Sequence, residues 1–486
     1  MSEVNFRTWW QKIRVLAFIV LLLAVGLGWF AYDQLFREVE QQFANDDERF
    51  EYGTLGAEAD RGIPYSIWLV LPRVFSDKLP GPGGYKSFGF PWEPGQEMPV
   101  GFSKKTVGIP RVTNNCALCH AASYRTRPDE TPTIYPTGPA HTTDVQRYIR
   151  FLSDVADDPR FNADTLLAEI GRAQSVSLAD QVTYRLALIP LTRRALKAQS
   201  VQFAWMNRPH FPDWGPGRDD AMNLTKYFMT DLPVDNSTGQ VDFPSIWNMG
   251  IRETSLLNWD GVTPAVHSVL VDSALGLGAP PGRGEKPGPA FLQRMAWLEG
   301  YLQKKPPPKF PFPTCDVQAA RGKVIYAAKC ACCHDVGAKY TGKVIDISKI
   351  RTDPERLNTW TQAAADEANW RVMEMRINRP GLTTTNGYAS PVLDGIWLRA
   401  PYLHNGSVPT LRDLLKPVAQ RTKVFYRGYD VYDPHDVGFI SSGPEAERVG
   451  FRLNVDERGN GNQGHEYGAD LSESSRDDLL EYLKTQ

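Results

Sequence analysis

The chain has 486 residues, of which 42% are hydrophobic and 23% are charged. That length and apolar content allow two or three domains with ample cores. The formal net charge of −2 gives no excess of basic residues, so nucleic-acid binding is excluded as a function class. The 40 glycines, 37 prolines and 11% aromatic residues indicate a loop-rich globular protein.

The first predicted element is an apolar helix near the N-terminus. Residues 15–32 (VLAFIVLLLAVGLGWFAY) carry no charge, a length sufficient to cross a bilayer and too long for the core of a typical signal peptide. The flanking charges are Arg7, Lys12 and Arg14 before it and Asp33, Glu38 and Glu40 after it. Because positive charge stays on the cytoplasmic side and no small-residue cleavage site follows, we expect a retained single-pass anchor in the cell inner membrane. The bulk of the chain should then lie in the periplasm.

The region behind the anchor divides into a stalk, a wrapping region and predicted helices. We expect residues 33–50 to continue as a polar helical stalk. Residues 51–115 are rich in Gly, Pro and Trp, which predicts irregular chain. Helical patterns return at 142–156 and 178–199.

A proline-rich run marks the clearest boundary in the chain. KKPPPKFPFP at 304–313 cannot be a helix or a central strand, so it predicts an extended spacer. Beyond it, residues 316–334 (DVQAARGKVIYAAKCACCH) predict a helix that runs into a cysteine-rich motif. The chain ends with SESSRDDLLEYLKTQ at 472–486, where a Ser cap, early acids and a late Lys predict a final helix.

Two C-x-x-C-H motifs point to the chemistry. They are CALCH, with Cys116, Cys119 and His120, and KCACCH, with Cys330, Cys333 and His334, which leaves Cys332 outside the pattern. In C-x-x-C-H the two thiols form thioether bonds to the vinyl groups of one haem, and the adjacent histidine lies under the iron as its proximal ligand. A structural zinc site usually needs four ligands from paired knuckles, which fits these motifs less well. Two chance matches are rare with six cysteines and eight histidines, so the sequence predicts two covalently bound haem c groups.

The predicted fold is mainly α-helical with extensive irregular loops, and two c-type cytochrome domains follow an N-terminal transmembrane helix. The expected boundaries are 1–32 for the cytoplasmic stub and anchor, 33–303 for the first haem c domain, 304–313 for the linker and 314–486 for the second haem c domain. Covalent haem attachment takes place outside the cytoplasm, which agrees with the predicted topology.

Cys315 and Cys332 lie outside both motifs. A disulfide between them would suit the oxidising side of a membrane. However, Cys315 should open a helix that ends near Cys330, which separates the two cysteines by about 20 Å at 1.5 Å rise per residue. A disulfide needs Cα atoms within about 7 Å, so we interpret both as structural thiols.

Each haem iron has a sixth coordination position, and the residues alone do not assign its ligand. The candidates are His141, His210, His267, His404, His435, His465 and several methionines. For any single histidine an ordinary surface or core role is more common. His404 (in RAPYLHNGSVPTL) and His465 (in RGNGNQGHEYGADLS) both lie in turn-rich stretches that can hold a ring over a flat cofactor, and periodicity leaves both open.

Several stretches together resemble the rubber-oxygenase-like dihaem cytochromes. They are RVTNNCALCH, WGPGRDDAMN (214–223), PSIWNM (244–249), LNWDG (257–261), APYLHNGSVPTLRDLL and GNQGHEYGADLS, and the resemblance extends from about residue 50 to the end. Those cytochromes are distant relatives of bacterial dihaem cytochrome c peroxidases and of the dihaem enzyme that matures tryptophan tryptophylquinone. The resemblance implies that His465 is the second axial ligand of the C-terminal haem, and that His404 lies near that haem without binding its iron.

The resemblance also implies roles around the N-terminal haem. The iron above His120 would keep an open or weakly held distal side where peroxide or dioxygen reacts, although no histidine stands in a recognisable distal motif. Trp247 matches a tryptophan that assists electron exchange between the haems, whereas plain core packing is its alternative role. Rubber oxygenases are secreted to reach an insoluble polymer, so rubber is not the expected substrate of a tethered chain.

Three kinds of function follow. The first is a haem-dependent oxidoreductase of the peroxidase or oxygenase kind, with electron transfer through the C-terminal haem. The second is a pure electron carrier with both haems six-coordinate, and the third is a structural or sensing subunit of a respiratory assembly. The expected partners are the inner membrane, through the N-terminal helix, and a redox partner such as a small cytochrome or a membrane dehydrogenase or oxidase.

Overall fold

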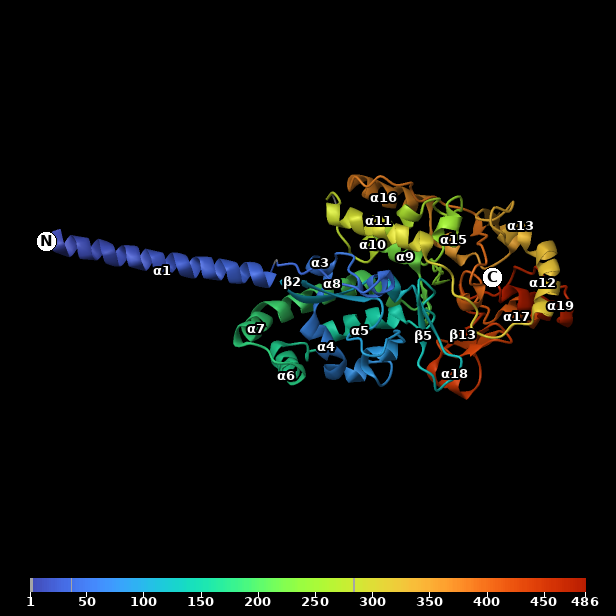
Figure 1. The fold of residues 1–486 in the computed structure, drawn as a ribbon, viewed down its shortest axis with the longest axis horizontal. Coiled ribbons are helices and arrows are strands. Elements are labelled where there is room, and N and C mark those ends of the chain that lie inside the picture. Colours follow the sequence, from blue (N-terminus) through green and yellow to red (C-terminus); the bar gives the residue numbers. More distant parts are fainter. Residues whose placement is uncertain (1–2, 36, 283–284) are drawn as a thin grey trace.

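A computed structural model of the protein describes residues 3–35, 37–282 and 285–486. Helix α1 (Glu3–Leu35) extends as a single rod from a body that holds the other described elements (Figure 1). Within α1, Trp9–Trp29 form 21 residues of mean hydropathy 2.0 with none of that window buried. By length and composition this helix can cross a membrane, and a signal sequence near an N-terminus meets the same criteria.

The predicted helical stalk at 33–50 is wrong. Helix α1 ends at Leu35, and the chain then runs along a strand, where Val39 N donates to Thr106 O (3.1 Å). A new helix, α2 (Asp46–Tyr52), begins only after Asn45, whose side chain accepts from Glu48 N. Backbone pairing and this N-cap therefore override the helical composition of the segment.

The elements between α2 and the proline-rich run build the first half of the body. The helices are α2, α3 (Glu58–Arg61), α4 (Tyr65–Val74), α5 (Val145–Asp157), α6 (Ala163–Ala173), α7 (Leu178–Thr183), α8 (Ile189–Phe203), α9 (Ala221–Met229), α10 (Val266–Gly276) and α11 (Pro289–Lys304). The strands are β1 (Ile63–Pro64), β2 (Phe102–Val107), β3 (Ile109–Asn114), β4 (Ala121–Tyr124), β5 (Thr133–Pro136), β6 (Arg218–Asp219) and β7 (Val241–Asp242).

Sequence patterns located α5, α7 and α8 but not the other helices of this half or the small sheet. Residues 51–115 were expected to be irregular, yet they hold α4 and an antiparallel sheet in the order β1–β3–β2. The helix expected at 142–156 is α5, which is capped by the Asp144 side chain. The helix expected at 178–199 is confirmed, but a π-turn at Tyr184–Leu188 divides it into α7 and α8.

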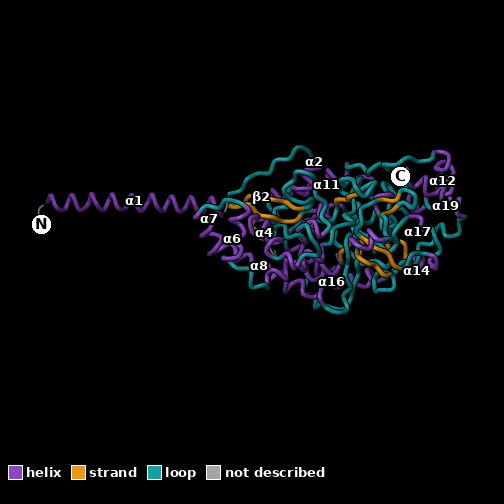
Figure 2. The backbone as a smooth tube through the Cα atoms, turned by 90° about the horizontal axis from the view of Figure 1, so that it is seen from below, coloured by secondary structure: helices purple, strands orange, loops and turns teal. Residues whose placement is uncertain are grey.

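The remaining elements form the second half of the body, coloured orange to red in Figure 1. Its helices are α12 (Asp316–Lys329), α13 (Ala331–His334), α14 (Ile347–Ile350), α15 (Glu355–Thr359), α16 (Gln362–Glu374), α17 (Leu411–Leu414), α18 (Pro444–Val449) and α19 (Glu473–Leu483). Its strands are β8 (Val344–Asp346), β9 (Gly387–Ala389), β10 (Val424–Arg427), β11 (Tyr432–Asp433), β12 (Gly438–Phe439) and β13 (Phe451–Asn454). Figure 2 shows how much of the chain between these short elements is loop. Residues 305–315 contain neither helix nor strand, α12 leads into the second motif, and Ser472 caps α19, all as predicted.

In each half, the helix near its start packs against the helix at its end. In the first half, the Arg49 guanidinium of α2 lies 3.9 Å from the Trp297 ring centroid of α11, and Tyr301 OH donates to Asp47 (2.8 Å). In the second half, α12 crosses α19 closely at Gly322, because a Cβ there would collide with the Asp478 carbonyl. In each half the motif lies between these two helices in the sequence, so their contact brings the two ends of the half together.

Buried charges join the two halves. Arg427 is 0% exposed and pairs with Asp242, which is 3% exposed, and its guanidinium also donates to Pro216 O (3.1 Å) and Gly406 O (2.6 Å). Arg218 is likewise fully buried. Breaking a buried ion pair leaves one charge buried without a partner and costs about 3–5 kcal/mol. These contacts therefore hold the halves in one relative orientation.

Candidate haem-binding sites

The first motif follows β3 on a tight turn. Cys116–Leu118 form one turn of 3-10 helix, and the Asn115 side chain accepts from Ala117 N (3.0 Å). The same side chain donates to the Glu51 and Gly53 carbonyls, which ties the turn to α2. His120 N donates to Cys116 O (3.0 Å), so both cysteines and the histidine lie within one helical turn.

The second motif has the same local geometry. His334 N donates to Cys330 O (3.1 Å), and the Cys333 carbonyl accepts from the Ser390 and Thr341 hydroxyls. Cys330 and Cys333 are half-buried, and burial raises the pKa of each thiol to about 11. Cys332 is exposed, which agrees with its exclusion from the motif. Cys315 is also exposed at the start of α12, and none of the six cysteines, all of which the structure describes, forms a disulfide.

A proline carbonyl orients each motif histidine. His120 Nδ1 lies 2.9 Å from Pro244 O, and His334 Nδ1 lies 2.7 Å from Pro391 O. A carbonyl can only accept, so Nδ1 carries the proton in both rings and Nε2 keeps its lone pair for a metal. Burial lowers the pKa of His120 to about 4 and also lowers that of His334. Both rings are therefore neutral near pH 7, which is the form that binds iron.

The distance between two histidine rings fits a haem in the second half. The ring centroids of His334 and His465 are 6.3 Å apart, with 50° between the planes. Two metal–nitrogen bonds of about 2 Å, with about 1.1 Å from each bonded nitrogen to its ring centre, add up to about 6.2 Å. Nδ1 of His465 is buried without a hydrogen-bond partner among the described residues. The residues here fit two axial imidazoles on one iron.

The loop before the final helix holds His465 in a constrained backbone. His465 has a φ of 48°, its N donates to Ile350 O (2.9 Å), and Gly464 before it has a φ of 76°. Arg421 donates to the carbonyls of Asn462, Gly464 and His465 from below the loop. Strained backbone that is held by many contacts is common where a side chain must be presented precisely to a ligand.

The remaining histidines are engaged elsewhere. His404 stacks on Tyr388 (3.9 Å between centroids) and His141 stacks on Phe439 (3.6 Å). His210, His267 and His435 contact Phe211, Glu299 and Asp436 respectively. Within the described chain, none of these rings contacts His120, whose aromatic neighbour is Phe243 at 6.5 Å. The two sites are therefore unequal, because a second imidazole faces His334 and none faces His120.

A repeated turn, which sequence reasoning missed, lies near each site. In LNWDGVTP (257–264) Leu257 pairs with Thr263, and in YLHNGSVP (402–409) Tyr402 pairs with Val408. Gly261 and Gly406 occupy the same left-handed position, with φ of 68° and 60°. The shared signal in the sequence is a Gly three residues before a Pro.

Each turn docks on the other half of the body. Ala389 N, two residues before Pro391, donates to Trp259 O (2.8 Å). Asp242 N, two residues before Pro244, donates to His404 O (2.9 Å). The His404 carbonyl thus supports β7, which leads to the Pro244 carbonyl that orients His120. The ring of His404 packs in the second half.

Trp247 lies three residues after Pro244 and contacts the segment that follows Pro391. It is fully buried, and its indole Nε1 donates to Asp394 O (3.1 Å). Cβ atoms added at Gly138 and Gly395 would lie 3.1 Å and 2.7 Å from its ring, so small residues make room for the indole. The Arg399 guanidinium lies 5.4 Å from the ring centroid.

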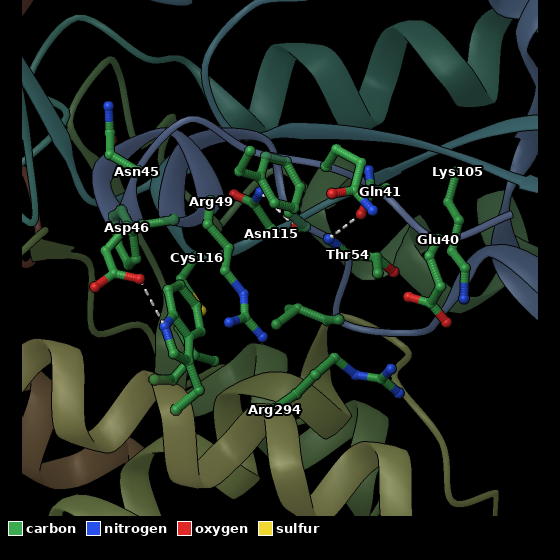
Figure 3. A pocket seen from close by; sticks show the side chains of 17 residues that line it. Glu40, Gln41, Asn45, Asp46, Arg49, Thr54, Lys105, Asn115, Cys116 and Arg294 are labelled. Atoms are coloured by element: carbon green, nitrogen blue, oxygen red, sulfur yellow. Dashed lines mark hydrogen bonds between the residues drawn. The ribbon is translucent and has the colours of Figure 1, made fainter.

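A polar cavity of about 690 Å³ lies against the first motif (Figure 3). Arg49 from α2 and Arg294 from α11 extend into it, and Cys116 forms part of its wall. Burial lowers the pKa of Arg294. The cavity opens the Cys116 edge of the first site toward solvent.

The comparisons with known proteins identify the class of the second half. The profile of the RoxA-like, cytochrome c-like family matches residues 387–426, the segment that contains Pro391 and His404. This segment is therefore similar to part of a cytochrome c-like domain, and such a domain implies covalently bound haem c.

Two relatives are similar to longer parts of the chain. "Uncharacterized protein y4iM" of Sinorhizobium fredii is 28% identical over 289 residues, which covers 50% of this chain and 64% of the relative. "Uncharacterized protein y4iJ" of the same organism is 26% identical over 364 residues, which covers 56% of this chain and 60% of the relative. The chain thus spans less than two thirds of the length of either relative.

Proposed function

We propose that this chain is a membrane-anchored periplasmic cytochrome with two covalent haem c groups, and that it acts as an oxidoreductase. The site of His120 would carry a peroxidase-like or oxygenase-like reaction, and the site of His334 and His465 would pass electrons. The observation that carries the proposal is the inequality of the sites, since a ring faces His334 at 6.3 Å and no histidine ring contacts His120 in the described residues.

The protein's part in this chemistry is to fix ligands and access. Haem c supplies one-electron redox chemistry and, where the iron keeps a free coordination position, activation of peroxide or dioxygen. The Pro244 and Pro391 carbonyls keep each proximal ring in one tautomer and raise its basicity. His465 closes the sixth position of the second site, which suits a site that only exchanges electrons.

A continuous chain of bonds joins the two proximal rings. From His120 it passes through Nδ1–H to Pro244 O, along the backbone to Trp247, and from the indole N–H to Asp394 O. Three residues back along the chain, Pro391 O accepts from His334. This path supports Trp247 as the residue through which electrons cross between the halves.

Electrons can enter or leave where the first site is open. The polar cavity beside Cys116 is lined by three basic side chains, Arg49, Lys105 and Arg294, and by two acidic ones, Glu40 and Asp46. Its small excess of positive charge would suit a redox partner with acidic groups. A small periplasmic cytochrome, or a membrane dehydrogenase or oxidase held near by α1, satisfies this requirement.

The spectrum of the pure, full-length protein in detergent tests the proposal. We expect two haems per chain, one low-spin and one high-spin, with cyanide or peroxide shifting only the high-spin component. Two low-spin haems whose spectrum does not change with cyanide would instead indicate a pure electron carrier. One haem per chain would contradict the two-site assignment itself.

A further inference from the structure

An exposed apolar stripe runs along the helix from α7 through the π-turn to α8. Leu178, Val182, Leu186, Leu191 and Val201 are each between 56% and 80% exposed. The opposite face of the same helix is buried in the body and includes Tyr184, Leu188, Ile189 and Leu196. A helix that is apolar on two faces has a second apolar surface to cover.

The π-turn keeps the stripe on one face. Leu178, Val182 and Leu186 are spaced four residues apart, but Leu191 follows Leu186 by five. The π-turn at Tyr184–Leu188 has i to i+5 hydrogen bonding and takes up the additional residue. Without it, Leu191 would rotate away from the exposed line.

The position and charge of this helix point to a lipid surface. In both Figure 1 and Figure 2, α7 lies at the end of the body from which α1 emerges, beside the last turns of α1. Trp29 and Tyr32, near that end of α1, have their rings 6.2 Å apart, and such aromatic residues mark the membrane–water boundary. Residues 178–203 contain one acidic residue, Asp180, and four basic residues. A basic amphipathic helix at this depth is typical of an interfacial membrane contact.

We propose that the α7–α8 helix is a second membrane contact, which inserts its stripe, Leu178 end first, into the outer interface of the membrane that α1 spans. This inference rests on the proposed membrane anchor. With two contacts the body cannot swing freely about the segment after Leu35, so one face of the body, and with it the opening beside Cys116, keeps a constant orientation to the bilayer.

The first test uses the body without α1, with residues 1–35 replaced by a cleavable secretion signal. None of the α1 side chains from Trp9 to Trp29 is buried, so this removal takes nothing from the core. We expect the body to float with phosphatidylcholine vesicles, and the triple variant Leu178→Gln, Val182→Gln, Leu186→Gln to lower the bound fraction about tenfold.

The matched control lies at the other end of the body. Val317 and Val324 on α12 are 67% and 71% exposed, and the variant with both changed to Gln should bind vesicles as the parent does. An equal loss in this control, or a parent body that stays unbound, would overturn the proposal. So would binding that vanishes in high salt on vesicles of any composition, because apolar insertion persists there. A parent body that dimerises in sedimentation while the triple variant does not would assign the stripe to a second copy.

Hydrogen exchange of the full chain in nanodiscs separates this inference from the anchor. We expect amides of residues 178–191 to be protected more in the parent than in the triple variant. If α1 is not an anchor, alkaline carbonate strips the full chain from membranes as it strips a peripheral protein, while the released body still binds vesicles. If only the stripe is wrongly assigned, the full chain remains in membranes and the amides of 178–191 exchange equally in both forms.

Discussion

Replacing His465 by alanine is the sharpest perturbation of the second site. The 6.3 Å between the His334 and His465 centroids leaves room for one iron bonded to both rings and for no further ligand atom. His404 cannot take over, because its ring stacks on Tyr388 and its carbonyl accepts from Asp242. The sixth position of one haem in two should therefore open, and the low-spin share of the haem should fall from about half to near zero.

The assay is visible and electron paramagnetic resonance spectroscopy of the ferric protein, with haem content measured on the same sample. Because the thioethers at Cys330 and Cys333 persist, haem content should stay at the parent value. Added imidazole should restore the low-spin signal by occupying the vacated space. His404→Ala is the control and should leave the spin state unchanged. A His465→Ala protein that stays low-spin, or a His404→Ala protein that turns high-spin, would refute the assignment.

Three further predictions concern other parts of the body. Cys333→Ala should lose one haem per chain by haem stain and mass, whereas Cys332→Ala should keep both; equal losses would show that the register of the motif is wrong. Trp247→Phe should slow electron exchange between the haems after photoreduction and cost about 0.5–1.5 kcal/mol for the lost hydrogen bond, since Asp394 O still accepts from Arg399. Trp397→Phe, which loses the bond from an equally buried indole to Pro308 O, should affect stability only. Burial raises the pKa of Glu51 to about 8 from 4.5, so between these pH values the folded state holds one more proton than the unfolded state and stability falls as pH rises. Glu51→Gln should remove up to about 1.4 kcal/mol per pH unit of that fall in denaturant titrations from pH 5 to 8; parallel slopes for parent and variant would count against it.

The sequence predicted the parts of the fold that local patterns determine. Helix α12 has its full signature within its own residues, and so does α19 with its Ser472 cap. The stalk failed as a prediction because residues 37–39 pair with a strand more than sixty residues away, and no helical pattern records that pairing. Strand β1 was missed for the same reason, since it is two residues long and is defined only by its partner β3. The β2–β3 hairpin is local, and the prediction of irregular chain from the Gly and Pro content of 51–115 overlooked it.

The candidate sites were predictable to the same extent. The C-x-x-C-H motifs are local, so Cys116, Cys119 and His120 could be named from spacing alone. The proline carbonyls that orient the rings come from more than fifty residues away, and only the fold brings them together. His465 needed a family resemblance for its prediction, because a turn-rich loop describes His404 equally well.

The repeat also shows how the two halves are linked. Asn248 and Gly395 both adopt left-handed backbone, each four residues after the proline that holds a motif histidine. Trp247 and Asp394 are therefore equivalent positions, and the indole of one donates to the carbonyl of the other across the interface. The two positions hold different residues, so the contact that links the halves runs in one direction, from the indole N–H to the Asp394 carbonyl. A variant that restores likeness, Trp247→Asp, should lose the link between the haems while the His334–His465 site keeps its low-spin spectrum.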